Sequence, residues 1–196
     1  MIKHFFQDMS KFEDPWFTYH PLYKQFADIL QDGMVMTELG SWKGQSASLI
    51  ATELKNANKK GVRFFCIDTW QGTSEDEHGG DKWVKEGKLF EKFQDNLSKV
   101  SDYYIPLRMT TEQASHHFPE QSVDICFVDA DHSYDGVYKD LELWTPKIKS
   151  GGIISGHDYC PQNSCWQECK KAVDDFWGKF GKEVKAVGGL AWVVQM

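Results

Sequence analysis

The sequence has no long uncharged apolar run, either at its polar start or later in the chain. Since a signal peptide or a membrane-spanning helix needs such a run, we predict a soluble, cytoplasmic protein that makes no membrane contact. Basic residues are also few: 22 Lys and Arg stand against 29 Asp and Glu, which leaves a net charge of -7. Because scattered lysines at that charge would not overcome repulsion by a phosphate backbone, nucleic acid is not expected as a partner.

Cysteine occurs in an odd number, with five residues spread from Cys66 to Cys169. A chain of 196 residues with 41% hydrophobic content can bury one core without cross-links, so a secreted disulfide framework is not expected. Cys160, Cys165 and Cys169 lie near His157, but their spacing is not the CxxC pattern of a zinc site. We interpret all five as reduced thiols in a single domain over residues 1–196.

Apolar residues alternate between strand-like runs and helical stripes, which is the pattern of a parallel sheet covered by helices. Strands are predicted at Val35–Leu39, Val62–Ile67, Tyr103–Met109, Val123–Val128 and Ile153–Ser155, followed by a hairpin of Val184–Val187 and Leu190–Val194. Pro106 places the third strand at a sheet edge, because proline cannot donate a ladder hydrogen bond. The sequence therefore predicts an α/β fold with helices on both faces of a doubly wound sheet.

Helical stripes occupy the intervals between these strands. Residues 1–33 are predicted as an N-terminal helical segment, and a long helix is predicted from Tyr134 to Ile148, ended by Ser150-Gly151-Gly152. Cys165 and Cys169 fall on the apolar stripe of a later helix. Residues 72–88 are polar, rich in glycine and without a periodic face, so we interpret them as a lid loop over a ligand.

The segment from Glu38 to Ser46, ELGSWKGQS, stands where the first strand ends and a helix begins. Gly40 and Gly44 allow a tight turn and a close ligand approach, and amides at the helix start favour an electron-rich group. The spacing is GxxxG, and Trp42 stands where a dinucleotide fold needs its second glycine, which disfavours NAD and FAD. A strand-to-helix turn that merely needs glycine is the alternative interpretation.

Three other strand ends carry polar side chains. Asp68, in Cys66-Ile67-Asp68-Thr69-Trp70, is placed where a carboxylate accepts hydrogen bonds from the two hydroxyls of a ribose, although a strand-end acid or a helix cap is the alternative. VDICFVDADHSY and KSGGIISGHDY end the fourth and fifth strands with Asp129, His132, His157 and Asp158. Because open α/β sheets bind ligands at the carboxyl ends of their strands, these side chains are predicted to share one site.

Together these segments resemble class I S-adenosylmethionine-dependent methyltransferases of the methyltransferase family 24 type and, more distantly, catechol O-methyltransferase-like enzymes. The motifs VDADHSYDGVYKDLELW and GGIISGHDY carry the resemblance, which spans Val35 to Val194. It implies a Rossmann-like sheet of seven strands in the order 3-2-1-4-5-7-6, with the last strand antiparallel. S-adenosylmethionine is the cofactor that it implies.

The resemblance also implies which residues hold that cofactor. Its methionine part and its ribose and adenine would lie against Glu38, Gly40, Ser41, Trp42, Gly44, Ser46, Asp68, Thr69, Trp70, Asp129 and the stretch from Thr111 to Ala114. Trp70 in particular would cover the adenine ring. In similar enzymes, the segment that here contains Trp16, Phe17, Tyr19 and His20 contributes to an acceptor pocket or a dimer contact, while core packing is the alternative.

Metal-dependent relatives bind magnesium through an acid after the fourth strand and an acid-amide pair after the fifth. These positions correspond to Asp129, His157 and Asp158. Because imidazole suits zinc, iron or manganese better than magnesium, the resemblance leaves open whether a divalent metal (Mg, Mn or another) is bound.

Asp129 and His132 are the predicted catalytic residues. His132 lies near the place where those relatives keep the base that removes a proton from the acceptor hydroxyl, and an ordinary imidazole pKa near ~6.5 suits that task. In the alternative interpretation His132 caps the following helix or bonds Asp129.

We therefore expect a methyltransferase that acts on a small hydroxylated metabolite such as a sugar, with N-methylation left open. A small-molecule acceptor and a second copy in a homodimer are the expected partners. Two alternatives keep the fold and the cofactor pocket: a different reaction, as in hydroxylase-like relatives, and a binding module without turnover.

Overall fold

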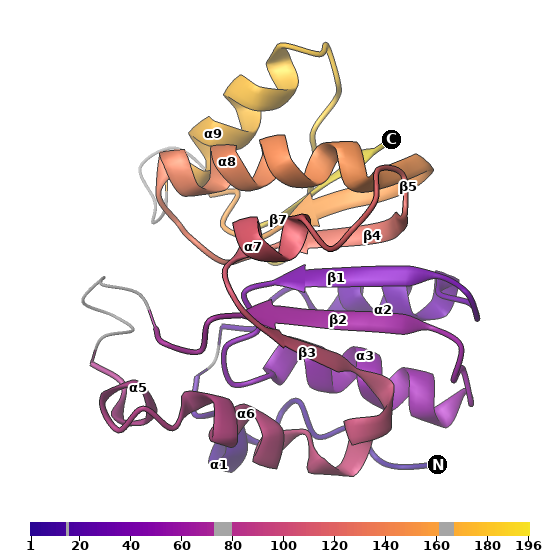
Figure 1. Cartoon of the computed structure of the whole chain (residues 1–196), viewed down its shortest axis with the longest axis vertical. Coiled ribbons are helices and arrows are strands. Elements are labelled where there is room, and N and C mark those ends of the chain that lie inside the picture. Colours follow the sequence, from indigo (N-terminus) through magenta and orange to yellow (C-terminus); the bar gives the residue numbers. More distant parts are fainter. Residues whose placement is uncertain (15, 73–79, 161–166) are drawn as a thin grey trace.

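The computed structural model describes residues 1–14, 16–72, 80–160 and 167–196. One seven-stranded sheet has the order β3-β2-β1-β4-β5-β7-β6 (Figure 1). Its strands are β1 Val35–Leu39, β2 Arg63–Asp68, β3 Ile105–Arg108, β4 Val123–Val128, β5 Ile148–Gly156, β6 Lys185–Val187 and β7 Ala191–Gln195. Strand β7 runs antiparallel to both β5 and β6, and the pairs from β3 to β5 are parallel. The predicted order, the antiparallel last strand and the edge position of Pro106 are confirmed.

Helices cover both faces of this sheet, as predicted. They are α1 Met9–Phe12, α2 His20–Ile29, α3 Gln45–Asn56, α5 Lys82–Lys85, α6 Leu89–Asn96, α7 Thr111–Ser115, α8 Tyr134–Trp144 and α9 Gln167–Gly178, with 3-10 turns at Ser98–Tyr103 and Thr145–Lys147. One apolar cluster joins the sheet to α2, α3 and α6, and a second joins it to α7, α8 and α9. In Figure 1, α2 and α3 accordingly lie apart from α8 and α9.

The helix after β4 is shorter than predicted. It ends at Trp144, and Ile148 already belongs to β5. Pro146 explains the difference, because proline has no N–H to continue the helical ladder. Ile148 therefore continues the apolar spacing of the sequence without continuing the helix. Residues 150–152, predicted to end that helix, lie inside β5, where Gly151 has a φ of 78°.

The remaining sequence expectations have mixed outcomes. The described part of residues 1–33 contains the helices α1 and α2, and the part of 72–88 that the structure describes includes the short helix α5. Cys66, Cys126, Cys160 and Cys169 are buried free thiols, whereas Cys165 and residues 73–79 lie outside the described residues. Among the described residues, no helix combines the length and the apolar character that crossing a bilayer requires.

Candidate active site

A cavity of about 630 Å³ opens where the predicted site residues converge, within the size range of ligand sites. Most of the residues that the sequence singled out line it: Gly40, Ser41, Trp42, Ser46, Asp68, Thr69, Thr111, Asp129, His132, His157 and Asp158. Other lining residues were not assigned from the sequence, among them Asp14, Thr18, Lys43, Gln45, Asp131 and Leu190. Glu38, Gly44 and Trp70 are not part of the wall.

The turn after β1 brings two strand ends into direct contact. Gly40 has a φ of 85°, and a Cβ at this position would lie 2.0 Å from the carbonyl oxygen of Asp129. Glycine is therefore required both by the backbone angle and by the close approach of β4. This contact places the cavity floor between the ends of β1 and β4.

Asp68 connects the same turn to the end of β2. Its Oδ2 accepts the backbone N–H groups of Ser41 at 3.0 Å and Trp42 at 2.8 Å, and its Oδ1 accepts that of Trp70 at 2.7 Å. The amides that we expected to face an electron-rich ligand thus donate to Asp68 instead. Asp68 therefore fixes the turn after β1 to the end of β2 at the cavity wall.

Trp70 does not cover the cavity, contrary to the sequence prediction. The indole is 2% exposed and packs against Phe90 and Phe93, while its Nε1 donates to the carbonyl of Trp42 at 2.8 Å. Trp70 has a positive φ of 52°, and its side chain lies in the core. The side of the cavity near Asp68 and Thr69 is formed by Met109, Thr110 and Thr111 together with Ile67.

Glu38 and Gly44 support the site from behind its wall. Glu38 is fully buried and accepts hydrogen bonds from Tyr23, Ser41 and Ser46 at 2.7 to 2.8 Å. Burial raises the pKa of this carboxyl to about 7, although the three hydroxyl donors act in the opposite direction. Glu38 therefore orients residues of the cavity without lining it, while Gly44 packs against Leu97 of the core.

Acids and imidazoles meet at the ends of β4 and β5. The Nε2 of His132 lies 3.2 Å from Oδ2 of Asp158 and 3.8 Å from Oδ1 of Asp129, and its Nδ1 is buried. Burial opposes ionisation of Asp129, but the neighbouring His157 and His132 hold the pKa of its carboxyl below the usual range. Asp129 is thus an anion at neutral pH, and Nε2 is the nitrogen of His132 that faces the cavity.

His157 uses both of its ring nitrogens within the protein. Its Nδ1 lies 3.2 Å from Asp158 and 3.6 Å from Asp129. Its Nε2 lies 3.2 Å from Oγ1 of Thr18, whose proton is donated to the carbonyl of Gly189 at 2.8 Å, so Nε2 must be the donor to Thr18. Burial alone would lower the pKa of His157, but the carboxylates of Asp129 and Asp158 raise it to about 10.

Tyr19 links the N-terminal segment to this cluster. Its hydroxyl donates to Oδ2 of Asp129 at 2.7 Å, and its ring packs on Phe127 and His157 with centroids 4.6 Å apart in each case. Burial and the charge of Asp129 raise the pKa of Tyr19 well above its ordinary value, so it acts here as a donor. Tyr19 is thus packed in the core, one of the alternatives that the sequence offered, and it also borders the cavity.

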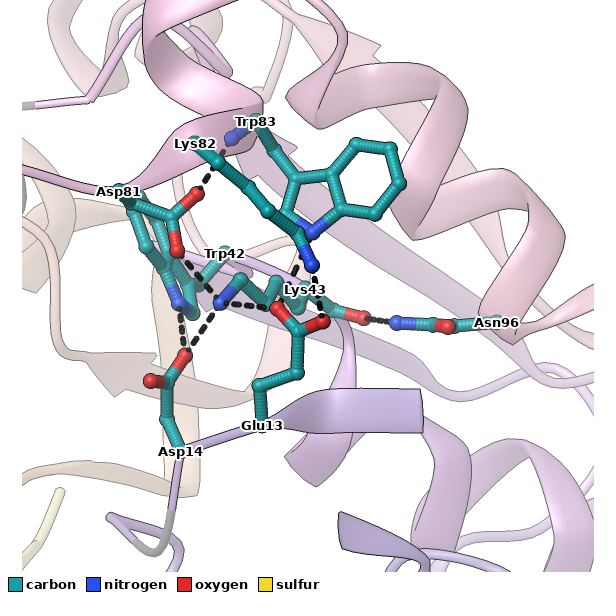
Figure 2. Close-up of polar contacts among 8 residues, drawn as sticks. All are labelled: Glu13, Asp14, Trp42, Lys43, Asp81, Lys82, Trp83 and Asn96. Atoms are coloured by element: carbon teal, nitrogen blue, oxygen red, sulfur yellow. Dashed lines mark hydrogen bonds and ion pairs between the residues drawn. The ribbon is translucent and has the colours of Figure 1, made fainter. Parts of the chain in front are cut away.

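Lys43, which lines the cavity, is the centre of a second charged cluster. Figure 2 shows its contacts. Its ammonium contacts Glu13 at 3.1 Å, Asp14 at 2.8 Å and Asp81 at 2.7 Å, and its side chain is 1% exposed. Burial disfavours the charge, but the hydrogen-bonded carboxylates raise the pKa of Lys43. Lys43 thereby ties the N-terminal segment and the start of α5 to the GxxxG turn. No local sequence pattern indicates this centre, because its acids are about 30 and 38 positions away.

A buried acid lies behind Thr111. Asp140, in α8, is 4% exposed, and its Oδ1 accepts the Thr111 hydroxyl at 2.5 Å. Burial raises the pKa of Asp140 to about 7. Because an acid with a raised folded-state pKa binds more protons when folded, its ionisation destabilises the protein as the pH rises through 7.

Asp140→Asn is therefore expected to reduce the loss of thermal stability between pH 6 and pH 8.5 by about 1–2 kcal/mol. Asparagine can still accept the Thr111 hydroxyl, so the packing is retained. Thermal unfolding at both pH values measures the difference, with Asp135→Asn on an exposed position of the same helix as the control. If the thermal stability of the Asp140 variant and of the wild type depended equally on pH, ionisation of Asp140 would not destabilise the folded protein.

The sheet order, the antiparallel β7 and a cavity at the strand ends define the class I methyltransferase architecture. Residues 37–159 match the family described as a methyltransferase domain, and the chain belongs to this family of S-adenosylmethionine-dependent methyltransferases. Its sequence is 27% identical over 155 residues to an uncharacterized protein of Sinorhizobium fredii, and 26% identical over 134 residues to one of Acanthamoeba polyphaga mimivirus. These matches cover 79% and 66% of the chain but only 16% and 53% of those relatives.

Solved structures share the fold at low sequence identity. The O-methyltransferase NovP superposes with a TM-score of 0.63 at 19% identity, over 89% of this chain and 78% of NovP. The calicheamicin methyltransferase CalS11 gives 0.64 at 15% identity, over 99% of this chain and 80% of CalS11. A protein from Clostridium thermocellum described as an rRNA methylase gives 0.62 at 12% identity, over 91% and 97% of the two chains.

Proposed function

We propose that the protein transfers the methyl group of S-adenosylmethionine to a hydroxyl group of a small metabolite such as a sugar. The observation that carries this proposal is one cavity that joins two sets of residues. Gly40, Asp68 and Thr111 line one part, and the charged cluster of His132 and Asp158 lines another. Fold neighbours support it, since NovP is an O-methyltransferase and CalS11 is described as a TDP-rhamnose 3'-O-methyltransferase.

The cavity suits this cofactor by charge and shape. When bound, S-adenosylmethionine supplies an electrophilic methyl group on a positively charged sulfur. Asp68 and Asp129 give the wall the opposite sign, and Gly40 leaves the floor without a side chain. In the proposed complex the carboxylate of Asp68 binds the ribose, and Thr111, which lines the same cavity, lies toward the adenine.

The charged cluster supplies a proton acceptor for the hydroxyl. In the proposed reaction the acceptor oxygen forms a bond to the methyl carbon, the carbon–sulfur bond breaks, and its electron pair remains on sulfur. The hydroxyl proton passes to the pair formed by His132 and Asp158, whose Nε2 and Oδ2 lie 3.2 Å apart. Alignment of the two substrates in the cavity contributes the larger part of the rate, and N-methylation would need the same alignment.

A metal-assisted form of this reaction is a second candidate, favoured by one observation. Asp129, His132 and Asp158 offer ligand atoms that all lie within 4.8 Å of one another, and this donor set fits a divalent cation. His157, which the sequence placed among the ligands, instead donates from both nitrogens. A bound cation would polarise the acceptor oxygen. Since Nε2 of His132 cannot bind a metal and accept a proton together, turnover that survives a chelator would select the metal-free form.

Calorimetric titration with S-adenosylmethionine, S-adenosylhomocysteine and NAD tests the cofactor assignment. Asp68→Ala is expected to weaken binding of the first two by about 10- to 100-fold, because a charged hydrogen-bond acceptor contributes about 1.5–3 kcal/mol. Asp28→Asn, at an exposed position of α2, serves as the control. Thermal unfolding checks that the Asp68 variant is folded, since three backbone amides lose their acceptor. Binding of NAD alone, or of none of the three, would contradict the proposal.

A further inference from the structure

The cavity wall is strongly acidic. Five carboxylates line it: Asp14, Asp68, Asp129, Asp131 and Asp158. Among the described lysines and arginines, Lys43 is the one that lines the cavity. A phosphate or diphosphate group needs cations or free backbone amides as partners, so in the metal-free form of the site the state of Lys43 decides whether this cavity can hold one.

Lys43 has no donor left for a phosphate. An ammonium has three N–H groups, and the ammonium of Lys43 has three carboxylate partners at 2.7 to 3.1 Å, on Glu13, Asp14 and Asp81 (Figure 2). Lys82 also contacts Glu13, at 2.9 Å, so three negative charges face two positive ones in this cluster. A phosphate would have to displace a buried ion pair, which is strongly unfavourable because it leaves charges without partners.

Three other donors at the cavity wall, the His157 ring and the amides of Ser41 and Trp42, are engaged as well. His157 donates from Nε2 to Thr18 and lies with Nδ1 between two carboxylates. The amides of Ser41 and Trp42 at the glycine turn donate to Asp68. The residues outside the description are Pro15, TSEDEHG at 73–79 and PQNSCW at 161–166, and their sequence contains no lysine or arginine.

The same cavity offers apolar contacts in place of charges. Trp16, Phe17 and Leu190 belong to its wall, and Trp16 is 43% exposed. Thr18 and Tyr19, the next residues along the chain, contact His157 and Asp129. An aromatic side chain at the open side of a cavity suits the flat face of a ring.

We infer that the methyl acceptor carries no phosphate group, and that it is an uncharged hydroxylated compound with a sugar or aromatic ring that packs on the Trp16 side of the cavity. This inference rests on the proposed methyl transfer and narrows its substrate class. The inferred acceptor differs from that of CalS11, which is described as acting on TDP-rhamnose, a nucleoside diphosphate sugar. The net positive charge of S-adenosylmethionine is compatible with the acidic wall.

Two measurements on the full chain test this inference. In the first, TDP and thymidine, which differ by the diphosphate, are titrated calorimetrically into protein saturated with S-adenosylhomocysteine. In the second, formation of S-adenosylhomocysteine is followed with acceptors matched in the sugar, for example p-nitrophenyl rhamnoside and TDP-rhamnose, within a panel of glycosides and phenols and their phosphorylated counterparts. Repeating the titration at high ionic strength screens the repulsion between the acidic wall and an anion, and so gives the anion its best chance to bind.

We expect TDP to show no saturable binding at concentrations below about 1 mM, which corresponds to a binding free energy weaker than about 4 kcal/mol. We expect methyl transfer only to the uncharged members of the panel. Binding of TDP in the micromolar range, or transfer to a phosphorylated acceptor, would overturn the inference. If no panel member is methylated, the TDP titration alone decides whether the cavity excludes a diphosphate. A protein that binds neither S-adenosylmethionine nor S-adenosylhomocysteine would refute the proposed function itself, which is a different outcome.

Discussion

Replacing His132 with glutamine is expected to lower the rate constant for methyl transfer by about 10²- to 10⁴-fold, the usual contribution of a general base. Glutamine keeps the size and one polar contact toward Asp158 but cannot accept a proton at neutral pH. Cofactor affinity should stay unchanged, because the contact of Nε2 is with Asp158 at the ends of β4 and β5 and not with Asp68 or Thr111. Turnover with an acceptor from the panel, and calorimetry with S-adenosylmethionine, measure the two quantities separately.

The pH dependence gives a second readout of the same residue. A protein that uses an imidazole base loses activity as that base becomes protonated at low pH, and the glutamine variant should lack this acidic limb. His116→Gln, at an exposed position of α7's carboxyl end, is the matched control and should behave as the wild type. Unchanged turnover in the His132 variant would assign the residue to structure alone and leave the cofactor site standing.

Gly40→Ala is expected to abolish measurable cofactor binding and to lower the free energy of unfolding by about 2–4 kcal/mol. The new Cβ would lie 2.0 Å from the backbone oxygen of Asp129 and 2.8 Å from Cα of Ala130, so backbone atoms of β4's carboxyl end must move. That movement would displace Asp129 from Tyr19 and from both histidines. Calorimetry and thermal unfolding measure the two effects.

Gly33→Ala separates the clash from the backbone strain. Gly33 has a φ of 91°, close to the 85° of Gly40, but a Cβ there meets nothing within 4 Å. This control should lose about 1 kcal/mol of stability and keep its affinity for the cofactor. If the two alanine variants lost stability and binding equally, the close approach of β1 and β4 would not be what makes Gly40 necessary.

Much of the fold follows from local sequence pattern. The predicted strands Val35–Leu39 and Val123–Val128 coincide with β1 and β4 residue for residue. Strands buried on both faces are mostly apolar, and Thr37, Glu38 and Asp124 are the polar exceptions in these two. Pro106 identified the edge strand from its missing N–H. The positions of Asp68, Asp129 and Asp158 at the cavity also follow from sequence, since acids placed after parallel strands meet at one edge of the sheet.

Other features depend on the direction of side chains, which spacing does not give. The sequence puts Trp70 two residues after Asp68, yet its side chain lies in the core rather than over a ligand. The three acids around Lys43 come from two distant segments, so no window of sequence contains the cluster. The role of Thr18 in holding His157 likewise depends on a contact across 139 positions.

Part of the cavity wall comes from segments that flank the matched domain, and this has a consequence for how proteins of the family diverge. The matched methyltransferase domain begins at residue 37 and ends at 159, and it contains Gly40, Asp68 and His132. Asp14, Trp16, Thr18, Tyr19 and Leu190 also border the cavity, yet all lie outside that range. On the proposed function, chains that share the central domain but differ in these flanking segments can keep one reaction and acquire different acceptors, without altering the residues proposed to hold the cofactor.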